Sequence, residues 1–231
     1  MHILLLGATG RTGTLILQDL LSRNHTITAL ARNPTSLTPT PGLGIIAGSP
    51  LNQSSISQAI TSTPTPPDAV IIALASVRAS DSPFAKPTSP PRLMADTHIA
   101  VLAAMKKHGI KRLITISAFG VGDSNEYVFW PMRMVLNYSA MKVAFEDHNV
   151  VEEVVRREAG EWEGEGKGLK WTLVRPCMLK EGDGKEVSVF GEQGRGVGLM
   201  PSVSRESVAR FVVERCLEKE EFVARTPVIC D

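Results

Sequence analysis

The stretch HILLLGATGRTG, residues 2–13, decides the fold of this chain. Its four consecutive apolar residues (3–6) are typical of a strand that is buried on both faces of a parallel sheet. Three glycines follow at the spacing GxxGxxG, and apolar residues at helical spacing then predict a helix over 11–23. A buried strand, a glycine-rich turn and a helix in this order predict a βα unit built around a phosphate.

The glycine-rich turn has the composition of a dinucleotide-binding loop. Glycines allow a tight turn and the close approach of a pyrophosphate, and the helix N-terminus offers free N–H groups and a positive dipole end. A structural turn without a ligand is the alternative interpretation. The residues expected to bind the dinucleotide here are Gly7, Thr9, Gly10, Arg11, Thr12 and Gly13.

Arg32 follows the second predicted strand, residues 26–31, about 20 residues after the glycine loop. Folds that prefer NAD place Asp or Glu at this point, where the carboxylate binds the ribose 2′-hydroxyl. A guanidinium suits a 2′-phosphate instead, and Arg11 could flank the same phosphate. The sequence therefore predicts NADP(H) rather than NAD(H), with a solvated strand-end Arg32 as the alternative.

Strand-like and helix-like segments alternate along the rest of the chain. Such repeats predict an α/β fold: a single-domain Rossmann fold over residues 1–231, doubly wound, with a mostly parallel sheet of six or seven strands and helices on both faces. Residues 131–159 are expected to be helical, with a possible break near Tyr138. The proline-rich stretch 76–92 is expected to form a lid loop, with a disordered tip as the alternative, and 177–203 a small substrate-side segment.

Composition excludes several classes of protein. The chain has 231 residues, of which 43% are apolar and 21% charged, so it is neither disordered nor a membrane bundle. A net charge of +1 argues against nucleic-acid binding. Three scattered cysteines and five dispersed histidines predict neither a disulfide framework nor a metal site. No targeting or membrane segment is visible, so a reduced, cytoplasmic chain is expected.

Five stretches together resemble a known family. They are GATGRTG (7–13), ALAR (29–32), VIIALAS (70–76), RLITISAFGVGDS (112–124) and WTLVRPCMLKEG (171–182). They resemble the atypical short-chain dehydrogenases, and more specifically the NmrA-like NAD(P)-binding group with its single-domain biliverdin/flavin reductase-type members. The resemblance implies a pyridine dinucleotide and a substrate cleft at the carboxyl ends of the strands. It adds to the cofactor-binding residues Leu74, Ala75, Ser76, Ser117 and Pro176.

Two sets of residues are candidates for catalysis. The resemblance implies that Ser117 points at the nicotinamide and binds a substrate carbonyl; a strand-end cap is the alternative. Tyr138 and Lys142 match YxxxK, a spacing that places both on one helix face. The ammonium would lower the phenol pKa, and the phenol would protonate a developing alkoxide. Aromatic packing and a solvated lysine are the alternative.

His148 is a competing proton donor. It stands where many relatives of the resembled family have Lys, and the reductase-type members have Asp-His near this point. Histidine can donate a proton near neutral pH, and Glu152, at i+4, could orient it. A packing histidine is the alternative.

The expected function is that of an NADP(H)-dependent oxidoreductase, which transfers hydride between the nicotinamide and a small cyclic or aromatic carbonyl compound. The resembled family leaves two alternatives: a non-redox isomerase or cyclase of secondary metabolism, and a non-catalytic NADP-binding redox sensor. The expected partner is a small-molecule substrate, and a homodimer stays open.

Overall fold

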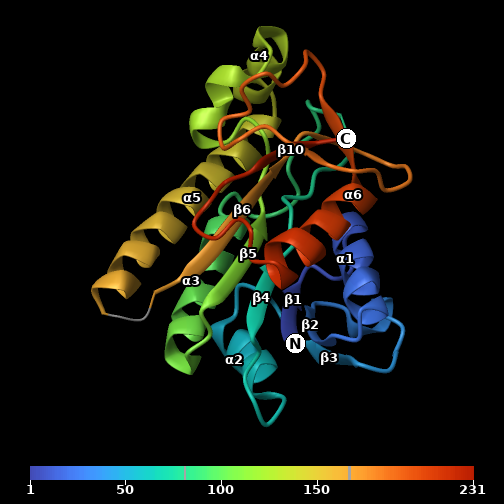
Figure 1. The fold of residues 1–231 in the computed structure, drawn as a ribbon, viewed down its shortest axis with the longest axis vertical. Helices are drawn as coiled ribbons and strands as arrows, with labels where there is room; N and C mark the ends of the chain where they lie inside the picture. The colour runs from blue at the N-terminus through green and yellow to red at the C-terminus, as the bar shows by residue number, and fades with distance from the viewer. Residues whose placement is uncertain (81, 166–167) are drawn as a thin grey trace.

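The main sheet has the strand order β3-β2-β1-β4-β5-β6-β10-β8. A computed structural model describes residues 1–80, 82–165 and 168–231. Neighbouring strands run parallel except at the β10–β8 edge, which is antiparallel (Figure 1). The strands are β1 (His2–Leu6), β2 (Thr26–Ala31), β3 (Leu43–Ala47), β4 (Ala69–Ile72), β5 (Arg112–Ile116), β6 (Lys170–Pro176), β8 (Ser188–Val189) and β10 (Val228–Cys230). This order, with its reversal between β1 and β4, confirms the doubly wound Rossmann fold.

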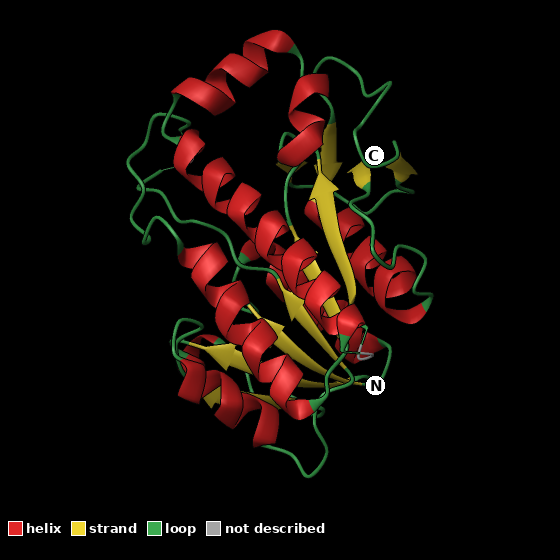
Figure 2. Cartoon of the chain, turned by 90° about the vertical axis from the view of Figure 1, so that its left-hand side faces the viewer, coloured by secondary structure: helices red, strands yellow, loops and turns green. Residues whose placement is uncertain are grey.

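Helices cover both faces of the sheet (Figures 1 and 2). One face carries α1 (Arg11–Ser22), α6 (Arg205–Arg210) and the π-helical η3 (Phe211–Glu218). The other carries α2 (Gln53–Thr61), α3 (Leu93–His108) and α5 (Met141–Gly164). A shorter helix, α4 (Trp130–Tyr138), precedes α5, and η1 (Pro34–Ser36) and η2 (Gly122–Tyr127) are short 3₁₀ helices.

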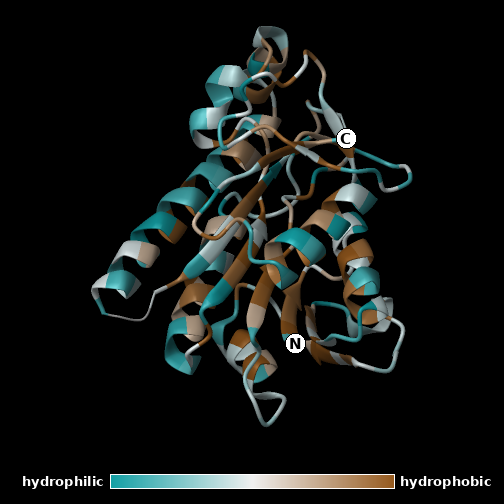
Figure 3. Cartoon of the chain, in the orientation of Figure 1, coloured by the Kyte–Doolittle hydropathy of each residue, from teal (hydrophilic) through white to brown (hydrophobic). Residues whose placement is uncertain are grey.

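The first strand explains how the two layers share the sheet. Ile3 and Leu5 pack into the α1/α6 layer, whereas Leu4 and Leu6 pack into the α2/α3/α5 layer, and none of the four is exposed. Alternate side chains of a strand point to opposite faces, so an uninterrupted apolar run is what a doubly covered strand requires. Figure 3 shows these hydrophobic strands between helices whose outer surfaces are hydrophilic.

Three segments outside this frame bear on the predictions. The stretch 76–92 folds back on itself, with Ala79 N–H donating to Lys86 O at 3.0 Å; residue 81 of this predicted lid lies outside the described residues. Within 177–203, β7 (Met178–Lys180) pairs in parallel with β9 (Ser202–Ser204). Residues 131–159 form two helices, as the sequence suggested, because Ser139 is extended with a ψ of −176°.

No helix in the described ranges combines the length and the apolar character that a membrane span requires.

Candidate functional site

The carboxyl ends of the parallel strands bring the predicted cofactor residues together. The glycine loop leaves β1, Arg32 leaves β2, and residues 74–76 lie just beyond β4. Ser117 directly follows β5 and Pro176 is the last residue of β6. Because parallel strands all end at one edge of a sheet, residues from five separate stretches lie along this edge, which includes the strand-order reversal between β1 and β4.

The glycine loop has a shape that only glycine permits at two positions. Gly7 has a φ of +90°, and a Cβ there would lie 2.5 Å from the carbonyl oxygen of Ala73. A Cβ at Gly13 would lie 1.9 Å from the carbonyl oxygen of Gly7. Gly10 N–H donates to Gly7 O at 2.9 Å and closes the turn. Backbone therefore packs directly against backbone in this loop. The glycines have no side chains that would keep a pyrophosphate away from it, as a pyrophosphate site requires.

Helix α1 begins at this loop without a side-chain cap. The N–H groups of a first helical turn have no partner within their own helix, and together with the helix dipole they favour an anion. Arg11 and Thr12 open this turn. Arg11 also forms an exposed ion pair with Glu181, at 3.9 Å, which links the loop to the 177–203 segment.

Arg32 is exposed at the end of β2. Within the described part of the chain it has neither a hydrogen-bond nor an ion-pair partner. Its guanidinium is therefore available to an anionic ligand at the position where dinucleotide-binding folds bind the adenosine ribose.

Ser117 presents a buried hydroxyl that nothing in the described structure satisfies. Its backbone N–H donates to Val174 O at 2.7 Å, but its Oγ has no hydrogen-bond partner. On β5, Leu113 packs in the α2/α3/α5 layer and Ile114 in the α1/α6 layer, so the alternation directs Thr115 and then Ser117 toward the former. Buried hydroxyls are normally hydrogen-bonded, so an unpaired one at this edge fits a ligand group.

Two buried histidines lie in the same layer. Both ring nitrogens of His98 on α3 form hydrogen bonds: Nδ1 is 2.6 Å from Met94 O, and Nε2 is 2.9 Å from Thr115 Oγ1. The carbonyl only accepts, so Nδ1 carries the proton and Nε2 accepts from the threonine hydroxyl. His148 on α5 is also buried, and its Nδ1 has no partner within the described residues. Burial lowers the pKa of each to about 4.

These values change the interpretation of His148. At neutral pH an imidazole with a pKa of about 4 is almost entirely neutral, so His148 is a poor acid and suits a hydrogen-bonding role better. The sequence reasoning missed His98 altogether. Its signal was a histidine within the apolar stripe of α3, four residues after the buried Met94.

The prediction that Glu152 orients His148 is wrong. Arg175 takes both oxygens of the Glu152 carboxylate, at 2.9 and 2.7 Å. A buried arginine side chain is stable only when a carboxylate balances its charge. Glu152 therefore pairs with Arg175 of β6 rather than with His148, which is four residues away on α5. Asp147 accepts the N–H groups of Met94 and Ala95, at 2.8 and 2.9 Å, and so caps α3.

The prediction that Tyr138 and Lys142 share a helix face is also wrong. Tyr138 ends α4, whereas Lys142 lies in the first turn of α5, and the extended Ser139 separates the two helices. The Tyr138 side chain is 78% exposed, and Lys142 pairs with Glu146 at 3.5 Å. A catalytic role for either residue stays a prediction, without the helical geometry that suggested it.

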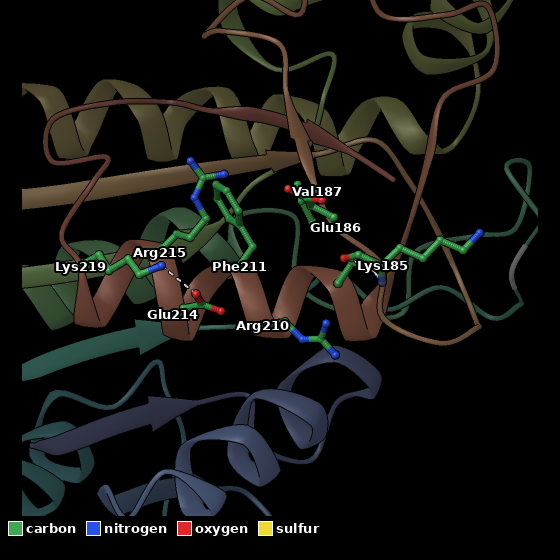
Figure 4. A pocket seen from close by; sticks show the side chains of 9 residues that line it. Lys185, Glu186, Val187, Arg210, Phe211, Glu214, Arg215 and Lys219 are labelled. Atoms are coloured by element: carbon green, nitrogen blue, oxygen red, sulfur yellow. Dashed lines mark hydrogen bonds and ion pairs between the residues drawn. The ribbon is translucent and has the colours of Figure 1, made fainter.

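A separate groove of about 390 Å³ lies along α6 and η3 (Figure 4). Several of the charged side chains that line it already have partners: Lys219 binds Glu214 at 2.7 Å, and Arg215 binds Glu221 at 2.6 Å. None of the predicted cofactor-binding or catalytic residues lines this groove. In the described ranges, no group of three or more His, Cys, Asp or Glu side chains is placed to bind a metal.

The low pKa values of His98 and His148 indicate that the free energy of unfolding falls in acid. Their folded-state pKa of about 4 is below the ordinary 6.5, so the unfolded chain binds protons first. Stability is fully present above pH 6.5 and falls as the pH drops toward 4, by on the order of 3 kcal/mol per histidine. Urea unfolding at pH 7 and pH 5 measures this, and His148→Asn should have the shallower pH dependence. Equal slopes in the two proteins would contradict the assignment.

Comparison with known proteins agrees with this geometry. The profile of the NAD(P)H-binding family matches residues 7–219. The chain is similar in fold to the anaerobilin reductase ChuY of Escherichia coli O157:H7, with a TM-score of 0.72 and 16% identity over 100% of this chain and 97% of that one. It is also similar to a short-chain dehydrogenase/reductase of Veillonella parvula in complex with NADP, with a TM-score of 0.70 and 18% identity over 100% and 94% of the two chains.

A third solved structure, a Rossmann-fold NAD(P)-binding family protein of Shigella flexneri, aligns with a TM-score of 0.63 and 22% identity, over 99% of this chain and 92% of that one. At such identities these likenesses establish the fold, whereas the profile match extends from the glycine loop to the end of the last helical segment. The chain belongs to the NAD(P)H-binding family.

Proposed function

We propose that the chain is an NADP(H)-dependent oxidoreductase that transfers hydride between the nicotinamide and a cyclic or aromatic carbonyl compound. The observation that carries the proposal is the buried Ser117 Oγ, which has no hydrogen-bond partner among the described residues. It lies at the carboxyl edge of the sheet, where the glycine loop leads from β1 into α1. A hydroxyl in this state has a donor free for a carbonyl oxygen.

The residues present suit the cofactor. At Gly7 and Gly13 the glycine loop has no side chains that would block a pyrophosphate. The backbone N–H groups of the first turn of α1 would bind the pyrophosphate oxygens. Arg32 would bind the 2′-phosphate, and residues 74–76 with Pro176 would flank the nicotinamide half. When bound, the reduced cofactor supplies the hydride.

The chain itself would orient the carbonyl and deliver a proton. Ser117 would donate a hydrogen bond to the carbonyl oxygen, which favours the charge that develops there. Tyr138 is the proposed source of the proton, and His148 is the proposed second hydrogen-bond donor to the carbonyl oxygen. His148 is buried and neutral, so it would act through an N–H group, whereas Tyr138 is exposed and would need the substrate to cover it.

Exposed apolar side chains support an apolar substrate. Within the described residues, most of the large apolar side chains that are exposed lie on three segments that follow β4, β5 and β6. They are Val77, Phe84, Phe129, Trp130, Met134, Tyr138, Met178, Leu199 and Met200. Exposed apolar surface that gathers at one edge marks a binding site. The anaerobilin that ChuY reduces is therefore a suitable first test compound for this chain.

Arg32→Ala tests the cofactor. We expect NADPH binding to weaken by about 1.5–3 kcal/mol, or roughly 10- to 100-fold, the value of hydrogen bonds to a charged group. NADH binding should not change, because NADH has no 2′-phosphate. Calorimetric titration of both nucleotides into both proteins measures this. Equal losses for NADPH and NADH would show that Arg32 does not read the phosphate.

Ser117→Ala tests the chemistry. We expect kcat for NADPH-dependent reduction of anaerobilin, or of an active compound from a panel of aromatic ketones, to fall about 100-fold, and NADPH affinity to fall much less than kcat. Thr226→Val is the control, because Thr226 also has a buried hydroxyl without a partner in the described structure but precedes β10, at the opposite end of that strand. Substrate conversion without NADPH consumption would favour an isomerase. Unequal binding of NADP⁺ and NADPH without any turnover would favour a sensor.

A further inference from the structure

Two cysteines that are 53 residues apart in sequence lie side by side in the fold. Cys177 directly follows β6 and Cys230 ends the neighbouring strand β10. The strands are paired in parallel with Ile229 opposite Pro176, so Cys230 and Cys177 are the next opposite pair. Cys177 N–H donates to Ile229 O at 3.0 Å, which continues the pairing to this point. Adjacent strands are about 4.8 Å apart, within the Cα separation that a disulfide spans.

The side chains face each other. Their Sγ atoms are 2.6 Å apart, and both residues are buried, at 3% and 8% exposure. An S–S bond is about 2.05 Å long, so bond formation requires only a small approach of the two sulfurs and no backbone rearrangement. Hydrogen bonding between the thiols raises the pKa of Cys177 and lowers that of Cys230, which fits an S–H of Cys177 that donates to the sulfur of Cys230.

The third cysteine has a different environment. Cys216 is fully buried in η3 among apolar side chains, and burial raises its pKa to about 12. A thiol in that state is a weak nucleophile. The chain therefore contains its own unreactive reference for the pair.

We propose that Cys177 and Cys230 form a reversible disulfide when the chain meets a peroxide. Cys230, as its thiolate, attacks one peroxide oxygen and the O–O bond breaks; the leaving hydroxide takes up the proton that Cys230 had lost, which gives a sulfenic acid and one water. Cys177 then attacks the sulfenic sulfur, and the second water leaves as the S–S bond forms. In total two S–H bonds and one O–O bond break, the two sulfurs lose two electrons, and hydrogen peroxide becomes two waters. A small-molecule thiol reverses the reaction by exchange.

The disulfide would close a covalent loop over the C-terminal part of the chain. This loop contains the 177–203 segment, α6 and η3. The next residue, Asp231, already ties the chain end to the start of α6, with its carboxylate 2.8 Å from Ser204 N and 2.6 Å from Ser207 Oγ. Because a cross-link restricts the unfolded chain, we expect oxidation to raise Tm by at least about 5 °C.

The experiment treats the whole folded wild-type chain with hydrogen peroxide, removes the peroxide, and then unfolds the chain in denaturant to block the remaining thiols with N-ethylmaleimide. Intact mass should show the loss of two hydrogens and one blocked thiol, and peptide mapping should join the Cys177 peptide to the Cys230 peptide. Dithiothreitol should restore three blocked thiols and the lower Tm. Cys216→Ser should give the same linked product, whereas Cys177→Ser and Cys230→Ser should give none.

The wild-type measurement decides the question even if a serine variant fails to fold. Met200 is 67% exposed, so its oxidation to sulfoxide in the same sample shows that the peroxide was active. Oxidised methionine with three free thiols would overturn the proposal. Separate sulfinic acids at Cys177 and Cys230, or a link that involves Cys216, would also overturn it.

Discussion

Replacing Gly13 with alanine is expected to lower dinucleotide affinity by at least about 100-fold, because the glycine loop has no space for a methyl group at this position. The new Cβ would lie 1.9 Å from the oxygen and 2.7 Å from the carbonyl carbon of Gly7. Both are backbone atoms, so no side chain can rotate away. Gly7 in turn lies against the backbone of Ala73, which leaves the loop little room to retreat. Gly13 lies in α1 without a positive φ, so the effect is steric and not conformational.

Gly160→Ala is the matched control. Gly160 is also a helical glycine, in α5, and nothing lies within 4 Å of the Cβ that alanine would add. Alanine there should leave dinucleotide affinity unchanged and stabilise the chain by up to about 1 kcal/mol, the difference in helix propensity. Calorimetric titration of NADPH, with circular dichroism to establish the folded state, separates the two variants. Near wild-type affinity in a folded Gly13→Ala protein would show that the glycine loop does not receive the pyrophosphate.

Most of the fold could be predicted from local sequence patterns. The apolar run at residues 3–6 predicts a doubly covered strand because the signal lies within the strand itself. The glycine loop and Arg32 are also local signals, since each directly follows a strand whose end sets its position. Parallel strands then bring these residues to one edge without any need to know the contacts between distant side chains.

The parts that could not be predicted depend on contacts between distant segments. Cys177 and Cys230 looked scattered, but the pairing of β6 with β10 makes them neighbours. Helical spacing suggested that Tyr138 and Lys142 share a face, yet an extended Ser139 between them ends the helix. Spacing within one element cannot reveal that a residue from another strand competes for the same side chain, and Arg175 competes for Glu152 in this way.

In the proposed function, the carboxyl edge of the sheet would combine a cofactor site with a substrate side. The backbone at Gly7 and Gly13 is closely packed, whereas the apolar side chains on the segments after β4, β5 and β6 are exposed. A substrate that covers them would exclude water from Ser117, and a hydrogen bond is stronger in such surroundings. The proposed substrate is therefore an apolar compound with a surface large enough to reach several of these segments.

Replacing Arg175 with methionine is expected to lower the free energy of unfolding by about 3–5 kcal/mol, the loss that follows when one partner of a buried ion pair is removed. Arg175 is not exposed, and its guanidinium binds Glu152 through two hydrogen bonds and Asp123 at 2.7 Å. It also donates to Glu192 O at 2.6 Å. Methionine fills part of the space but leaves the Glu152 carboxylate, 7% exposed, without its main counter-charge.

The control and the rescue distinguish lost charge pairing from lost packing. Arg156 is half exposed, and its guanidinium lies 4.0 Å from the same carboxylate, which makes a weaker ion pair. Arg156→Met should therefore lower the free energy of unfolding by about 1 kcal/mol or less. Adding Glu152→Leu to Arg175→Met removes the stranded charge, so the double variant should recover a large part of the loss. Urea unfolding of the four proteins at one pH gives the comparison. If the double variant is less stable than Arg175→Met alone, packing dominates, and the buried carboxylate is not what makes Arg175 necessary.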